Sequence, residues 1–479
     1  MLFVNAGASA LTISLNTIPA EFKPLEIKTA PHYIVYNHFI VTLVEESKHG
    51  DMIARLAESW DVNESSTKYT FEISKKYKWS DGSPVSASDV VKHFEYAASR
   101  KTTVHSDFSI LKRTWAKGNQ VFFELNEPNT RFLHELSRPE AGILKPDLID
   151  KENLFAISSG PYFLKEIKND SIILKRNMYF PSPVKDYPAE VAFVPRLWAE
   201  LKPELKSGKV DVALAPFDVS LDGHNEIMKS SAVKLFEPFA AFSFFLTINP
   251  YSKKLEDLDT RKFIQSIIKP GTINFGKLSA TWSASKQLYL EDSPGRANKE
   301  WLDAFWTGVS KSGLLRPAKA PTELRILLRK GVELYSQIEI LFKKAGIKLI
   351  PVTYTDMEEA IKLRSDPDAY DIAIRSNEFS GGDVLDNLVV TFTSAHRIIP
   401  LPESSKIPDV LEKAKQEPSL SKRFPMYESI GKEVLEQAYI SPLAYSRIMF
   451  YYQPHLDLSE WTKLYPELTA WKIKTQKAP

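Results

Sequence analysis

The alternation of hydrophobic and polar residues predicts secondary structure most clearly in three stretches of the chain. In the first stretch, Tyr69–Ile73 alternates with period two, which indicates a half-buried strand. An Asp81–Gly82 turn follows it. Ser86 and Asp89 then fit a capping box, in which each side chain accepts a hydrogen bond from the other residue's amide group. We therefore expect a strand, a turn and a helix of about three turns.

The second stretch alternates between strand and helix patterns. Short apolar runs at Leu324–Leu328, Ile347–Val352 and Tyr370–Ile374 predict three strands, with helical stripes between them and Gly346 closing the first helix. This order favours a parallel sheet with right-handed crossovers. Ligands bind such sheets at the carboxyl ends of strands, so the segment after Ile374 is the most informative loop of the chain.

The third stretch lies near the carboxyl end. The apolar residues from Ile430 to Ala438 recur at helical spacing, and Ser441–Pro442 is expected to end that helix. Tyr445–Tyr452 then predicts a strand. A strand that follows a complete α/β unit can join a sheet formed earlier in the chain.

Composition narrows the possible functions. The 479 residues suffice for two or three domains. The net charge of +2 comes without a basic block, which argues against a nucleic-acid partner. Cysteine is absent, which excludes disulfides, thiol nucleophiles and Cys-ligated metals. No stretch of eighteen apolar residues suggests a membrane span. Residues 1–10 fit either the end of an export signal or a first strand.

Known catalytic and cofactor motifs are missing from the sequence. We find no Gly-x-Ser-x-Gly elbow, no His-Glu-x-x-His helix and no glycine-rich nucleotide loop. The nine histidines are scattered. We therefore expect no catalytic residues, no metal site and no cofactor. A hydrolase that uses two distant carboxylates stays open as an alternative.

A series of short motifs runs along nearly the whole chain. They are Leu56–Trp60, Tyr69–Phe71, Trp79–Pro84, Ser88–Val91, Ser159–Tyr162, Lys175–Asn177, Leu205–Asp211, Leu246–Pro250, Asp259–Lys262, Ala345–Lys348, Tyr370–Asp371 and Ser441–Leu443. Each motif is weak alone, but the ordered set resembles the family 5 extracellular solute-binding proteins. These are the oligopeptide, dipeptide and nickel receptors of ABC importers.

The resemblance implies an α/β fold of the periplasmic-binding-protein type, bilobed, large and of class II. Lobe one is expected to comprise residues 1–30, 159–240 and 446–479, with an inserted subdomain at 31–158. Lobe two is expected at 241–445. In this family a hinge closes the two lobes around a ligand in a deep cleft.

The loop after Ile374 departs from the family pattern. In peptide-binding members it resembles Trp-x-x-Asp-Tyr-x-Asp-Pro, and an Asp there receives the amino group of the peptide. Here Ser380 stands roughly where that Asp would be, and the Trp is missing. A hydroxyl group cannot balance a buried ammonium group. Either Glu378 or Asp383 takes over this role, or the ligand has no ammonium group there.

Position in the family pattern suggests a set of ligand contacts. His38 could equally be a core residue, Asn249 could cap a strand end, and Trp282 could belong to the core. Two glycines, Gly381–Gly382, would allow close approach of the backbone to a ligand. The candidates are Tyr36, Asn37, His38, Asn249, Trp282, Arg375, Asn377, Glu378, Phe379, Ser380, Gly381 and Asp383.

The sequence thus predicts a monomeric receptor in the periplasm or on the cell surface. It would pass a small ligand, foremost a short peptide, to an ABC permease in the membrane. The alternatives are a ligand-sensing protein without a transport role and the hydrolase named above. We also expect the substitutions Asp383→Ala and Glu378→Ala to weaken binding with little effect on the stability of the empty protein.

Overall fold

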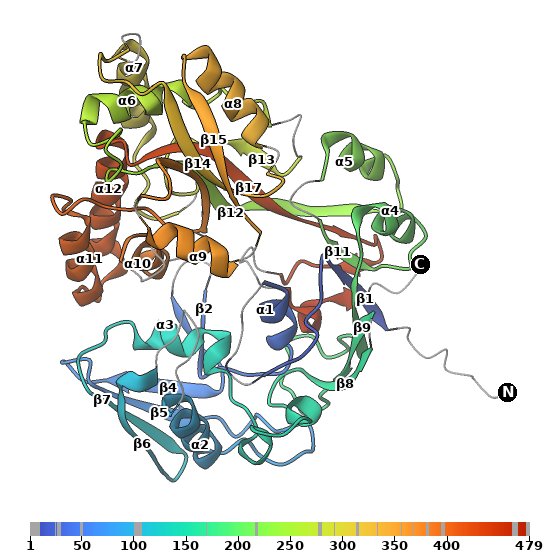
Figure 1. Cartoon of the computed structure of the whole chain (residues 1–479). Helices are drawn as coiled ribbons and strands as arrows, with labels where there is room; N and C mark the ends of the chain where they lie inside the picture. Colours follow the sequence, from blue (N-terminus) through green and yellow to red (C-terminus); the bar gives the residue numbers. More distant parts are fainter. Residues whose placement is uncertain are drawn as a thin grey trace. The chain divides into compact units, whose positions relative to one another are not determined.

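The computed structural model of the chain (Figure 1) forms two compact units. Unit 1 comprises residues 1–216, 225–238 and 449–479, and unit 2 comprises 217–224 and 239–448. The structure describes residues 10–475 with the exception of 24, 26–29, 48–50, 100–107, 169, 216–218, 276–279, 292, 313–315, 333, 356, 367, 380–382, 394–397 and 462–467. No helix in this described part is long and apolar enough to cross a membrane.

Unit 1 contains a mixed sheet in which β1 is the central parallel strand. It pairs in parallel with β10 and β11, and β9 and β8 extend the sheet in antiparallel fashion beyond β10. The strands of this sheet are β1 (Leu11–Leu15), β8 (Tyr162–Lys168), β9 (Ser171–Arg176), β10 (Glu190–Pro195) and β11 (Val212–Leu214). The remaining elements are α1 (Ala30–Tyr36), α3 (Phe132–Ser137), α4 (Trp198–Lys206) and the short strands β2 (Val44–Glu46), β3 (Met52–Ala54), β18 (Leu456–Asp457) and β19 (Lys474–Thr475).

A separate antiparallel sheet in unit 1 has the order β4-β5-β7-β6 and packs against helix α2 (Figure 1). Its strands are β4 (Ala57–Val62), β5 (Lys68–Ile73), β6 (Leu111–Lys117) and β7 (Gln120–Leu125). The predicted capping box is confirmed at α2 (Ala87–Ala98). The Asp89 amide donates to the Ser86 hydroxyl at 3.1 Å, and the Ser86 amide donates to the Asp89 carboxylate at 2.9 Å.

Unit 2 contains the α/β region that the sequence predicts. β14 (Glu323–Arg329) pairs in parallel with β15 (Lys348–Tyr354) and with β16 (Ile372–Glu378), which confirms the predicted parallel sheet. β16 then pairs antiparallel with β12, and β13 (Trp282–Ala284) pairs with β17. The helices are α6 (Leu258–Ile267), α7 (Lys299–Ser312), α8 (Leu334–Lys344), α9 (Met357–Ser365), α10 (Leu385–Phe392), α11 (Ile407–Gln416) and α12 (Leu420–Glu436).

The two faces of the unit 2 sheet carry different helices. One face buries Leu246 and Ile374 in a cluster that includes the apolar side chains of α6 and α8. On the other face, Phe245 belongs to a cluster with α10, α11 and α12, which also pack on one another (Figure 1). Ala373 lies on that same face, in a smaller cluster that includes Leu363 of α9. Residues of β16 therefore alternate between two distinct cores.

Two long strands are divided between the units. They are β12 (Lys234–Ile248) and β17 (Ile440–Tyr452), and helix α5 (Leu221–Met228) is divided as well. The units change over at 238/239 and at 448/449. The predicted lobes, with their boundaries at 240/241 and 445/446 and the insertion at 31–158, stay predictions.

The sequence misplaced one boundary. Helix α12 ends at Glu436, before the predicted stop at Ser441–Pro442. Strand β17 begins at Ile440, so it contains that dipeptide and starts earlier than the predicted Tyr445. Ser441 lies in β17, and its buried hydroxyl donates to the carbonyls of Gln265 and Ile268 at the end of α6.

Candidate ligand-binding site

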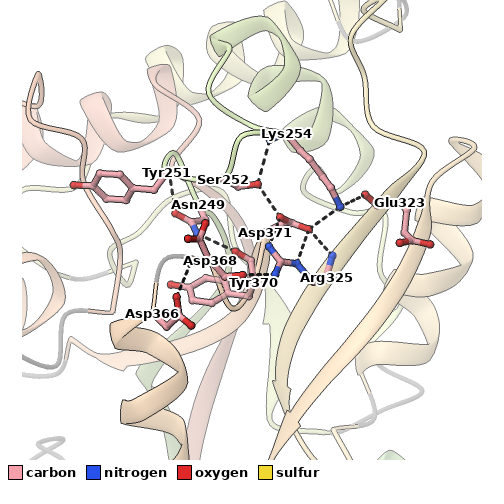
Figure 2. Close-up of polar contacts among 10 residues, drawn as sticks. All are labelled: Asn249, Tyr251, Ser252, Lys254, Glu323, Arg325, Asp366, Asp368, Tyr370 and Asp371. Atoms are coloured by element: carbon pink, nitrogen blue, oxygen red, sulfur yellow. Dashed lines mark hydrogen bonds and ion pairs between the residues drawn. The ribbon is translucent and has the colours of Figure 1, made fainter.

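A buried carboxylate anchors the start of β16. Figure 2 shows Asp371 at the centre of contacts from Ser252, Lys254 and Arg325. The fully buried carboxylate accepts from the Arg325 amide at 2.7 Å, from the Ser252 hydroxyl at 2.7 Å and from the Arg325 guanidinium at 3.1 Å. Burial alone would raise the pKa of Asp371, but these hydrogen bonds and the Lys254 charge hold it below its ordinary value.

Asn249 closes the same region through its side chain. Its amide group donates to the Tyr370 carbonyl at 2.9 Å, and its carbonyl oxygen accepts from the Tyr251 amide at 3.1 Å (Figure 2). Asn249 is 1% exposed. These bonds give it the strand-capping role that the sequence left open, and they hold Tyr370 in place. Its role as a ligand contact stays a prediction that these internal bonds do not favour.

Arg375 is the exceptional residue of β16. It pairs with Phe245 of β12, on the face of the sheet that also carries Ala373. The side chain is only 3% exposed, yet no carboxylate and no carbonyl oxygen of the described residues accepts a hydrogen bond from its guanidinium group, and its polar neighbour is the Tyr370 hydroxyl. A buried charge without a partner costs several kcal/mol, so proteins rarely keep one without a functional reason.

The surroundings of Arg375 keep it cationic without neutralising it. Burial lowers the pKa of Arg375 to about 10, and the nearby positive charge of Arg364 contributes to this decrease. Tyr370 and Tyr354 act in the opposite direction. The guanidinium carbon lies 5.6 Å from the centre of the Tyr370 ring, within range of a cation–π interaction. At neutral pH the group is therefore charged.

The two other buried arginines described in unit 2, Arg261 and Arg423, have carbonyl or carboxylate partners, although the Arg423 Nε atom makes no hydrogen bond. Arg261 donates to the backbone carbonyls of Leu255, Glu256 and Gln437 at 2.7–3.1 Å. Arg423 forms an ion pair with Asp383 at 2.7 Å. Unit 2 can thus provide carbonyl or carboxylate partners for buried guanidinium groups, which makes their absence at Arg375 among the described residues distinctive.

Asp383 has a structural role in this protein. One carboxylate oxygen pairs with Arg423, and the other accepts from the Tyr427 hydroxyl at 2.6 Å and from the Leu385 amide at 3.1 Å. Asp383 is 7% exposed. The expectation that Asp383→Ala leaves the stability of the empty protein nearly unchanged does not fit this geometry, because the substitution would leave Arg423 buried without its partner. Its predicted role as a ligand contact has no support in these bonds.

The other predicted ligand contacts of this loop differ in burial and in their hydrogen bonds. The Asn377 side chain donates to the Asn387 carbonyl at 3.0 Å and to the Thr391 hydroxyl at 2.5 Å. Glu378 is half-buried at the end of β16. Phe379 is fully buried in the core beside α10 and α12. Ser380 and Gly381 lie outside the described residues.

Trp282 lies in β13 of unit 2. It is half-buried, its ring packs beside Phe244 and Phe275, and its indole nitrogen has no hydrogen-bond partner. This position fits both expectations for Trp282, a core residue and a ligand contact.

Three predicted contacts belong to unit 1. His38 is a core residue: its Nδ1 bonds the Ile34 carbonyl at 2.8 Å and its Nε2 bonds the Ala470 amide at 3.2 Å. Burial lowers its pKa to about 4. Tyr36 is buried, and burial raises its pKa while a hydrogen bond with the backbone of Leu25 acts in the opposite direction. Asn37 is half-buried.

The sequence reasoning missed Arg364 and the Asp371 network. Arg364 could have been noticed because it lies one helical turn after Ala360, in the helical stripe predicted between the strands Ile347–Val352 and Tyr370–Ile374. Asp371 belongs to one of the family motifs, but that motif gives no indication of its hydrogen bonds to Ser252 and Arg325. Among the residues that the structure places, no group of three or more His, Asp or Glu side chains is arranged to hold a metal ion.

Comparisons with known proteins agree with this architecture. Residues 51–268 match the model of the bacterial extracellular solute-binding proteins, family 5, middle part. Di/tripeptide-binding protein 1 of Pseudomonas aeruginosa (strain UCBPP-PA14) is 24% identical over 504 aligned residues, which cover 94% of this chain and 90% of that protein. The probable D,D-dipeptide-binding periplasmic protein DdpA of Escherichia coli (strain K12) is 25% identical over 225 residues, 45% of this chain and 43% of that protein.

The fold has a close counterpart among solved structures. The crystal structure of NikA from Brucella suis in complex with Fe(III)-EDTA superposes with a TM-score of 0.83 at 18% identity, covering 98% of this chain and all of that one. The fold is therefore of the periplasmic-binding-protein class. Within that class, the chain is similar to the family 5 extracellular solute-binding proteins, in line with the resemblance of its sequence motifs. It is a binding protein and not an enzyme.

Proposed function

We propose that this protein is the receptor of an ABC importer, acts outside the cytoplasm and binds a short peptide through its carboxylate group. The family description and the di- and tripeptide-binding relatives support this role. The periplasm or the cell surface, a monomeric state and a permease as membrane partner form part of the proposal. Closure of two lobes on the ligand also stays a prediction.

The observation that carries the ligand assignment is the buried guanidinium of Arg375, which has no anionic partner among the described residues. A carboxylate can accept two parallel hydrogen bonds from one guanidinium group, which gives both affinity and orientation. A peptide's terminal carboxylate would supply the negative charge that Arg375 lacks. Asn377, Glu378 and Phe379 follow Arg375 directly in the chain and remain proposed neighbours of the ligand.

The amino group of the ligand has a less obvious partner. Asp383 is held by Arg423 and Tyr427, so it is not available to an ammonium group without breaking a buried ion pair. This geometry supports a site in which the anionic end of the ligand dominates recognition. The missing Asp at Ser380 is consistent with the same proposal.

Titration calorimetry and thermal unfolding with matched peptides test this function. We expect Ala-Ala and Ala-Ala-Ala to bind and their carboxyl-terminal amides to lose at least tenfold in affinity, because one charged contact is worth about 1.4 kcal/mol or more. A ligand at a hundredfold excess over Kd should stabilise the protein by about 2.7 kcal/mol. Arg375→Gln should abolish binding, whereas Lys362→Gln, which changes an exposed charge on α9, should not. Equal binding of acids and amides would contradict the proposal.

A further inference from the structure

A second arginine lies over the same face of the sheet as Arg375. Helix α9 buries Ala360 completely, and Arg364 is one helical turn further along, on the same side of the helix. The intervening Leu363 packs against the cluster of Tyr370 and Ala373. Because Ala373 and Arg375 share one face of β16, α9 brings Arg364 toward Arg375.

Arg364 is also incompletely satisfied. Its Nε atom is buried and has no hydrogen-bond partner. The charge of Arg364 acts on Arg375, as the lowered pKa of Arg375 shows. A like charge nearby disfavours the charged form of each guanidinium group, and an anion beside both groups would relieve this repulsion.

The described groups that act on the charge of Arg375 are Arg364, Tyr370 and Tyr354, and no carboxylate is among them. The acidic residues that follow α9, Asp366 and Asp368, are exposed, and the Asp366 carboxylate accepts from the Asp368 amide at 2.9 Å. Asp371 is engaged by Arg325, Ser252 and Lys254. The remaining polar neighbours that influence Arg375 are the phenols of Tyr354 and Tyr370, which can donate hydrogen bonds but carry no charge at neutral pH.

We propose that Arg364 and Arg375 form one subsite for a doubly charged anionic group of the ligand. This inference rests on the proposed receptor function and narrows its ligand class. A phosphate monoester or a pair of carboxylates neutralises both guanidinium groups, whereas a single carboxylate leaves one positive charge uncompensated. The preferred peptide therefore ends in a dianionic residue, either acidic or phosphorylated.

Calorimetry with isosteric peptide pairs tests the subsite. Ala-Asp is compared with Ala-Asn, and Ala-phosphoserine with Ala-Ser. We expect the charged member of at least one pair to bind roughly tenfold tighter or more, since an additional charge-assisted contact is made. The pair that shows this preference identifies the source of the second charge, a carboxylate or a phosphate.

Substitutions on α9 test whether Arg364 causes the preference for the charged peptide. Arg364→Gln should remove the preference for the charged member while Ala-Asn and Ala-Ser still bind. Lys362→Gln, an exposed charge change two residues away, should keep the preference. Circular dichroism and the melting temperature of each empty variant verify folding. If Arg364→Gln does not fold, competition of malonate and inorganic phosphate with Ala-Asn on the unmodified protein provides the second measurement, and competition by neither anion counts against the subsite.

The outcomes separate this inference from the proposed function. Equal affinities within both pairs, with clear binding of all four peptides, overturn the dianion subsite and leave the receptor function intact. Absence of binding by all four peptides and by Ala-Ala overturns the proposed peptide function. A preference that survives Arg364→Gln overturns the assignment to Arg364.

Discussion

At the scale of single residues, unit 2 treats its buried charges in two different ways. Asp383 and Arg423 neutralise each other and are both less than 10% exposed. Arg375 is equally buried but has no such partner. The first arrangement stabilises the fold, and the second keeps a cation available. The difference yields opposite predictions for substitutions at these sites.

Asp383→Ala should destabilise the protein strongly. It leaves the Arg423 guanidinium buried without its carboxylate and removes the acceptor of the Tyr427 hydroxyl, which costs about 3–5 kcal/mol. Urea unfolding measures the loss. Arg423→Leu added to Asp383→Ala should recover part of it, because the isolated charge is then gone. If the Asp383→Ala variant is as stable as the natural chain, the Asp383–Arg423 ion pair does not contribute to stability.

Arg375→Met should have the reverse effect on the empty protein. Burial lowers the pKa of Arg375 to about 10 from 12.5, which corresponds to about 3 kcal/mol of unfavourable free energy in its charged form. Replacement by an apolar side chain of similar length removes this cost. We expect a higher unfolding free energy without ligand together with lost ligand binding. A less stable empty variant would indicate that Arg375 has a structural partner.

At the scale of secondary-structure elements, Asp371 joins three segments of unit 2. It bonds the start of β14 through Arg325 and the turn after β12 through Ser252, while its own chain continues into β16. These bonds fix the strand that carries Arg375. A change at Asp371 should therefore affect both stability and binding, although Asp371 is not proposed to touch the ligand.

Asp371→Asn should lower the free energy of unfolding by about 1–3 kcal/mol, because hydrogen bonds to a charged acceptor are lost. The pH dependence supplies a second readout. The pKa of Asp371 lies below its ordinary value of 3.8. Its contribution to the free energy of unfolding is therefore complete above pH 3.8 and is lost as the pH falls through the lowered pKa. Denaturant unfolding below pH 4 should be less steeply pH-dependent in the variant. Identical pH profiles would argue against the network.

Local sequence patterns predicted secondary-structure elements better than they predicted which side chains contact one another. The period of hydrophobic residues located β5, α2 and the series from β14 to β16, because each of these elements buries one regular face. The end of α12 was wrong, since Pro442 is tolerated inside β17. Arg375 was among the predicted contacts through its position after Ile374. The Asp383–Arg423 pair spans 40 residues and depends on tertiary packing, which no local pattern encodes.

At the scale of the whole molecule, acid and ligand should act on different units. His38 and His93 are both fully buried in unit 1, and burial lowers their pKa values to about 4 and about 3. The unfolded chain binds these protons near pH 6.5, so unfolding becomes easier as the pH falls below that value. The proposed ligand contacts Arg375 in unit 2.

We therefore expect unit 1 to lose stability between pH 6.5 and pH 4, on the order of 3 kcal/mol for each histidine. Hydrogen exchange followed by mass spectrometry can resolve the two units. After correction for the pH dependence of intrinsic amide exchange, acid should lower protection first around α1 and in the β4-β5-β7-β6 sheet with α2, and a bound peptide should raise protection first in β16 and α9. Uniform changes across both units would contradict this division.

The path of the chain has a practical consequence. Almost all of unit 2 is encoded by one uninterrupted segment, residues 239–448, which is entered along β12 and left along β17. These two strands are neighbours in their sheet. We therefore expect that this segment can be exchanged between homologues as a single continuous insert, and that such an exchange would transfer the proposed ligand preference together with β16 and α9.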